Sequence, residues 1–110
     1  MSTVKHTVSS FDADLNLLRD HLLQMGTLVD AAFVDATRAL VTHDAAAAVK
    51  VIEQDAQVDA LEALVEHEAV QIIARRQPLA VDLRDIMAAV RIGSELERIG
   101  DLAKNIAKRA

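Results

Sequence analysis

The first part of the chain carries apolar residues at alternating spacings of four and three. The series runs from Phe11 to Ala36 without a break and comprises Phe11, Leu15, Leu18, Leu22, Met25, Val29, Ala32 and Ala36. This spacing places every member on one side of an α-helix and is typical of a helix that packs along its whole length in a bundle. The T-H-D segment at residues 42–44 favours a helix end, because its side chains compete for backbone hydrogen bonds. We therefore predict a first helix over about residues 10–42.

Two further helices follow from the same pattern. Asp44 is a suitable N-cap for the alanine run behind it, and four β-branched residues then recur every seven positions, at Val51, Val58, Val65 and Ile72. Pro78 cannot donate a backbone hydrogen bond and disfavours helix at the residue before it, so a turn is expected there. The predicted second and third helices cover about residues 44–76 and 79–109. The third has its own apolar series, at Leu83, Ile86, Val90, Leu96, Ile99, Ala103 and Ile106.

Helices of about 30 residues, each roughly 45 Å long at 1.5 Å per residue, must pack side by side when their connections are short. The sequence thus predicts an all-α protein, an up-down-up antiparallel three-helix bundle that forms one domain over residues 1–110. The presence of only 2 Phe and 1 Pro agrees with long helices. Gly93 and Gly100 stand seven residues apart in the third helix. They indicate close approach to a neighbouring helix, with simple tolerance of glycine as the alternative.

The charge balance restricts the possible partners. The chain has 17 acidic and 12 basic residues, a net charge of −5, which opposes non-specific binding to nucleic acid or anionic lipid. No apolar run approaches the roughly 20 residues that span a bilayer, and the first residues do not resemble a signal peptide. Cysteine is absent, which excludes disulfides and thiolate metal sites. We expect a cytoplasmic protein without nucleic-acid binding or direct membrane insertion.

Acidic residues form a stripe along the second predicted helix. No lysine or arginine occurs between Lys50 and Arg75, and four acidic residues fall within an arc of about 60° beside the apolar stripe. These are Asp55, Asp59, Glu62 and Glu66. On the third predicted helix, Glu97 and Asp101 are four residues apart and therefore lie one above the other.

Two acidic rows on consecutive helices can face each other across a groove, where a hard cation would offset their repulsion. Carboxylate oxygens suit Mg, Ca or Mn, and carboxylate-rich sites also hold Fe or Zn, so the residue types do not select the metal. The alternative is a solvated acidic face in which Arg98 and Lys104 screen Glu97 and Asp101.

No enzyme motif is present. None of the four histidines follows a Glu by three residues, so the Glu-x-x-His pattern of di-iron bundles is missing, and no phosphate-binding loop or nucleophile motif occurs. Three arginines flank the predicted turn, namely Arg75, Arg76 and Arg84. They either bind an anion or a partner's acidic surface, or compensate the helix end and local acids such as Asp82 and Asp85; the second reading is favoured.

Five segments in this order resemble the PhoU family of phosphate-uptake regulators. They are F-D-A-D-L-N-L-L with M-G-T-L-V-D, then V-I-E-Q-D-A-Q-V-D-A-L-E, then I-I-A-R-R-Q-P-L-A-V-D-L-R, and then L-E-R-I-G-D-L-A-K-N-I-A. The resemblance covers nearly the whole chain from Phe11, and its most specific parts are R-R-Q-P-L-A-V-D-L-R and E-R-I-G-D.

The resemblance implies two three-helix repeats per protein, with E-x-x-x-D or D-x-x-x-D motifs that hold multinuclear metal clusters at the surface. It assigns Glu97 and Asp101 to such a site and, with a looser match, Asp55 and Asp59. It also implies a negative regulator that couples the ATPase of the phosphate ABC transporter to a sensor histidine kinase. A carboxylate-bound metal store or metalloenzyme remains the alternative function.

This chain has about half the family's length and resembles one repeat. A single repeat would expose the apolar surface that normally packs on its partner, so we expect a homodimer or higher oligomer.

Overall fold

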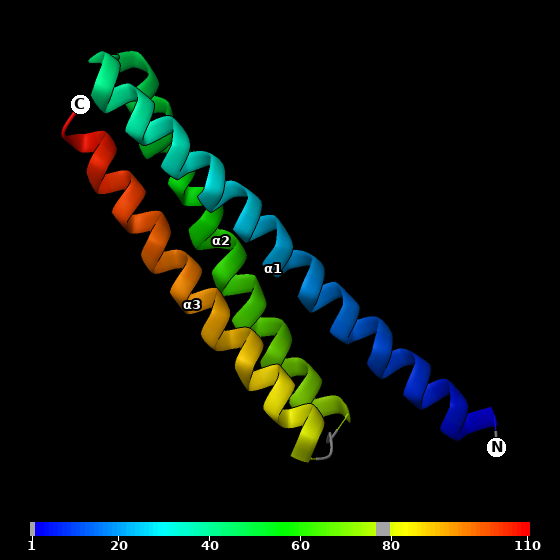
Figure 1. The fold of residues 1–110 in the computed structure, drawn as a ribbon. Coiled ribbons are helices and arrows are strands. Elements are labelled where there is room, and N and C mark those ends of the chain that lie inside the picture. The colour runs from blue at the N-terminus through cyan, green and yellow to red at the C-terminus, as the bar shows by residue number, and fades with distance from the viewer. Residues whose placement is uncertain (1, 77–79) are drawn as a thin grey trace.

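The computed structural model describes residues 2–76 and 80–110 as three long helices. They are α1 (Ser2–Thr42), α2 (Ala45–Arg76) and α3 (Ala80–Lys108). Each helix packs on both others, and successive helices run in opposite directions, which gives a rod of 62 × 20 × 16 Å (Figure 1). The prediction of an all-α antiparallel three-helix bundle is confirmed. None of the described helices is long and apolar enough to cross a membrane.

The helix α1 begins at Ser2, well before the start expected near residue 10. The expected turn at Pro78 lies outside the described residues, which resume with α3 at Ala80.

The turn between α1 and α2 has a well-defined hydrogen-bond pattern. His43 adopts the left-handed conformation, with φ of 54°, and the Asp44 amide donates to the Ala39 carbonyl at 2.9 Å. This pattern closes the end of α1. The Asp44 carboxylate then accepts from the Ala47 amide at 3.0 Å, so the predicted N-cap of α2 is present.

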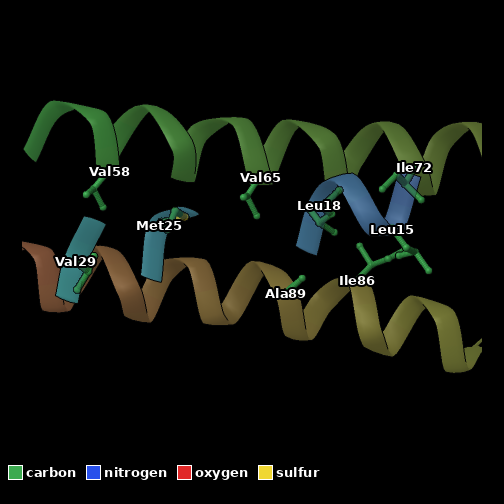
Figure 2. Close-up of a cluster of buried hydrophobic side chains, with 10 residues drawn as sticks. Leu15, Leu18, Met25, Val29, Val58, Val65, Ile72, Ile86 and Ala89 are labelled. Atoms are coloured by element: carbon green, nitrogen blue, oxygen red, sulfur yellow. The ribbon is translucent and has the colours of Figure 1, made fainter. Parts of the chain in front are cut away.

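The main core is formed by larger side chains from all three helices. Met25, Val65 and Ile86 are fully buried, and Figure 2 shows their neighbours pointing into the same interior. Its members are Leu15, Leu18, Met25, Val29, Val58, Val65, Ala69, Ile72, Ile86 and Ala89.

A second cluster, near the turn between α1 and α2, consists mostly of alanine. It contains Ala36, Ala39, Ala48, Val51, Ala103 and Ala107. Since alanine side chains are short, the helices can pack closely at this end. One polar contact also joins α1 to α2, between His21 Nδ1 and Glu68 Oε1 at 2.6 Å.

Both predicted interface glycines are buried on α3. A methyl group at Gly93 would lie 3.6 Å from side-chain atoms of Leu22 and Val65, which is ordinary contact. The packing therefore tolerates glycine at this position without requiring it. At Gly100 the nearest atom would be Oδ1 of Asp55, at 3.4 Å, so this glycine leaves space beside a carboxylate.

Replacing Gly93 with alanine is expected to raise the free energy of unfolding by about 1 kcal/mol, because alanine is the better helix former and the methyl group fits. The Gly100→Ala variant should gain less, since its methyl group removes water from the Asp55 carboxylate. Urea unfolding of the two variants beside the parent chain checks the order. A larger gain at Gly100 than at Gly93 would contradict it.

Candidate metal centre

Three carboxylates from two helices converge on one side of the bundle. Asp55 and Asp59 come from adjacent turns of α2, and Asp101 comes from α3. One oxygen atom of each lies within 4.8 Å of the others. Asp55 is buried, whereas Asp59 and Asp101 are exposed. Asp59 and Asp101 are called the rim carboxylates below.

Asp55 is the one charged residue that is buried in the described part of the chain, with 7% of its surface exposed. It stands four residues after Val51 and three before Val58, both of which are core residues. The helical period therefore directs Asp55 toward the interior, beside the space left by Gly100. A carboxylate in such a position needs a cation or hydrogen-bond donors.

The pKa of Asp55 is raised above its ordinary value. Burial is the main cause, and repulsion by the Asp59 carboxylate adds to it. Lys104 acts in the opposite direction, while Asp101 raises the pKa further. The nearby positive charge therefore does not compensate fully for burial and for the two like charges.

Glu97 belongs to the same electrostatic environment. It is half-buried on α3, and its pKa is raised by burial first and then by the charges of Asp59, Asp101 and Asp55. Glu97 contributes none of the three mutually close oxygens. Because the charges of all three carboxylates raise its pKa, it lies near the three-carboxylate group and is a candidate additional ligand.

The cations near this group are arranged differently from the screening expected from the sequence. Arg98 pairs with Glu95 at 3.6 Å on the exposed side of α3. The sequence instead predicts that Arg98 screens Glu97. Lys104 Nζ lies 3.6 Å from Asp55 Oδ2, so it pairs across to α2 and not with its own neighbour Asp101.

The remaining acids of the α2 stripe lie outside this group. Glu62 is half-buried and Glu66 is exposed, and neither has an oxygen in the three-carboxylate set. The sequence pattern did not separate Asp55 and Asp59 from Glu62 and Glu66, because the separation depends on which part of α3 lies opposite.

Two of the three predicted arginines, Arg75 on α2 and Arg84 on α3, have side chains in the described part of the structure. Arg75 is exposed, donates from Nε to the Gln71 carbonyl at 3.4 Å, and lines a surface cleft with Asp14 and Glu68. Arg84 is exposed on α3, and the side chain of Arg76 lies outside the described residues. The acids beside Arg75 favour local charge compensation over anion binding.

The donor set fits a hard divalent cation. Every candidate ligand is a carboxylate, and oxygen ligands at short mutual distances suit Mg, Mn or Ca, with Fe and Zn also compatible. A bound cation would lower the pKa of Asp55 and Glu97 and reverse the repulsion between the rim carboxylates. Two of the three acids are exposed, so the site is open to solvent.

Without metal, the protein should become more stable as the pH falls from neutrality. The folded-state pKa values of Asp55 and Glu97 lie above their ordinary values of 3.8 and 4.5, so the folded chain holds these protons more tightly than the unfolded chain does. Stability contributed by the two groups therefore rises as the pH falls through the raised values and stops rising below the ordinary ones.

Chemical unfolding at a series of pH values in a chelating buffer measures this dependence. The Asp55→Asn/Glu97→Gln variant serves as the control, because it removes the two carboxyl groups whose pKa is raised and leaves the rest of the chain unchanged. A difference between the two proteins that stays constant with pH would contradict the prediction.

Comparison with known proteins gives consistent matches along the chain. The family model described as the PhoU domain matches residues 22–110. A "Phosphate-specific transport system accessory protein PhoU homolog" from Rhizobium meliloti is 46% identical over 104 residues, which are 94% of this chain and 44% of that protein. The accessory protein PhoU of Edwardsiella tarda is 44% identical over 106 residues, 96% of this chain and 44% of its own length.

A solved structure supports the same relationship. The crystal structure of PhoU from Pseudomonas aeruginosa matches with a TM-score of 0.87 and 44% identity, over 90% of this chain and 47% of that one. The chain therefore spans about half the length of the relatives it matches.

Proposed function

The chain belongs to the PhoU family, and we propose that it is a negative regulator of phosphate uptake and of the phosphate-starvation response. The observation that carries this proposal is the match of residues 22–110 to the PhoU domain, together with the names of its relatives as accessory proteins of phosphate-specific transport. The chain spans less than half the length of those relatives, so the activity and partners of the whole proteins are proposals for this chain.

The proposed mechanism is contact through helix faces, in which the protein acts as a cytoplasmic adaptor between the transporter ATPase and a sensor histidine kinase. The rod exposes several large apolar side chains, among them Leu23, Val41 and Val70 at 62% or more. Exposed apolar residues on helices are suited to binding partner helices or grooves. No catalysis is assigned to the chain.

We further propose that Asp55, Asp59, Glu97 and Asp101 bind a divalent cation or a multinuclear cluster. The convergence of three of these carboxylates, and the raised pKa of the buried one, support this assignment. A bound metal supplies positive charge at an otherwise acidic surface. The carboxylates would hold it between α2 and α3 and so link the two helices.

A second copy of the chain is proposed to cover part of the exposed apolar surface. A homodimer or higher oligomer would bury side chains such as Leu23, Val34 and Val41, which are at least 47% exposed on α1. Light scattering at tens of micromolar checks this, and a monodisperse monomer would refute it.

Complementation tests the regulatory proposal. A bacterial strain that lacks its PhoU protein and carries a phosphate-starvation reporter would express this chain under abundant phosphate. We expect reporter activity to fall by several-fold, and to fall less with the Glu97→Gln/Asp101→Asn variant at equal protein levels. Full reporter activity with well-expressed parent chain would reject the regulatory function.

The alternative, a metal store or carboxylate-bridged metalloenzyme, is favoured by the same three-carboxylate group. Redox cycling of bound iron, or metal-dependent turnover by the purified chain, would support it. Metal that binds without either activity supports the adaptor.

A further inference from the structure

Lys104 is placed to compete with any cation that enters the three-carboxylate group. It follows Asp101 by three residues on α3, yet its ammonium reaches across to Asp55 on α2, with Nζ 3.6 Å from Oδ2. The buried carboxylate of the group therefore has a cation of its own chain as a partner.

This pair is loose and incomplete. The separation of 3.6 Å exceeds the roughly 2.7–2.9 Å of a strong charge-assisted hydrogen bond. The three carboxylates of the group also lie close together, and one ammonium cannot neutralise all of them, so negative charge remains in excess. Lys104 thus reduces the repulsion without removing the attraction for a second, more highly charged cation.

Lys104 can also leave without disturbing the core. Its side chain is 33% exposed and has a flexible four-carbon stem, whereas that of Asp55 is only 6% exposed. The mobile partner of the pair is therefore the lysine. When it rotates outward, its head can enter water while its stem stays against the helix.

We propose that Lys104 is a built-in competitor for the metal centre. Its ammonium pairs with Asp55 when no metal is bound, and a divalent cation must displace it to reach this carboxylate. The competition lowers the affinity of the centre and stabilises the metal-free protein. This inference rests on the metal binding proposed above and concerns its regulation by the chain's own residue.

The test compares Mn²⁺ affinity in the Lys104→Met and Arg98→Met variants by isothermal titration calorimetry at fixed ionic strength. Both variants lose one positive charge from α3, but Arg98 pairs with the exposed Glu95 and not with Asp55. We expect Lys104→Met to bind Mn²⁺ about tenfold more tightly than the parent, and Arg98→Met to change the affinity less than threefold. Lys104→Arg, which keeps the charge, should retain affinity close to that of the parent.

Stability of the metal-free proteins provides a second measurement. Lys104→Met should unfold at lower urea concentration than Arg98→Met in chelator, and Mn²⁺ should shift its midpoint upward by more. If the metal-free Lys104→Met protein does not fold, Lys104→Gln replaces it. Equal affinities in Lys104→Met and Arg98→Met would overturn the competitor role and leave the metal centre intact. Absence of Mn²⁺ binding by every variant would reject the proposed metal centre itself.

Discussion

Truncation of Met25 to alanine is expected to lower the free energy of unfolding by about 3 kcal/mol, a large part of the stability of a domain of this size. Met25 is fully buried in the main core, in the part of α1 that faces both α2 and α3. Its sulfur lies 4.0 Å from the position that a Cβ on Gly93 would take. A cavity at this point has a glycine on one side, so no neighbouring side chain can collapse into it from there.

Met87 provides the matched control for this prediction. It is the same residue type and lies on α3, but 51% of it is exposed. Its replacement by alanine should change stability by no more than about 0.5 kcal/mol. Equilibrium unfolding in urea measures both variants, and similar losses would mean that Met25 is not packed as the structure has it.

The three-helix architecture was predictable because burial follows the helical period. The alternating series from Phe11 to Ala36 contains several residues that the structure buries, including Leu18, Met25 and Val29. The start of α1 was predicted too late. Ser9 and Ser10 are residue types that favour an N-cap just before Phe11, but Val4 and Val8 continue the same apolar alternation toward the N-terminus. The apolar period therefore indicated the helix start better than the two serines did, because α1 continues through them to Ser2.

The candidate site was only partly predictable, since its composition depends on the register between α2 and α3. The period shows that Asp55 and Glu62 lie beside the apolar stripe, but it does not show which of them meets α3. Gly100 opposite Asp55 and the approach of Asp101 settle that point in the structure. The same register brings Lys104 to Asp55, a pair between residues 49 positions apart that no local spacing indicates.

Neutralising the two rim carboxylates, in an Asp59→Asn/Asp101→Asn variant, is expected to reduce Mn²⁺ affinity on the order of 100-fold, because oxygens close to Asp55 lose their charge. The Glu62→Gln/Glu66→Gln variant is the matched control. It removes the same charge from the acidic stripe but leaves the three-carboxylate group unchanged, so its affinity should stay within about threefold of the parent. Elemental analysis after purification without a histidine tag, followed by calorimetry with Mn²⁺, measures both.

The same substitutions should act on stability in the opposite direction. In chelator, the Asp59→Asn/Asp101→Asn variant loses repulsion against Asp55 and should unfold at higher urea concentration than the parent, by roughly 0.5–1 kcal/mol. A solvated acidic face without a ligand would give this gain but no change in metal content. A metal centre requires both effects together, because carboxylates that repel one another in the empty protein become ligands that attract a common cation. Equal metal content in the two double variants would therefore exclude Asp59 and Asp101 as ligands, whatever their effect on stability.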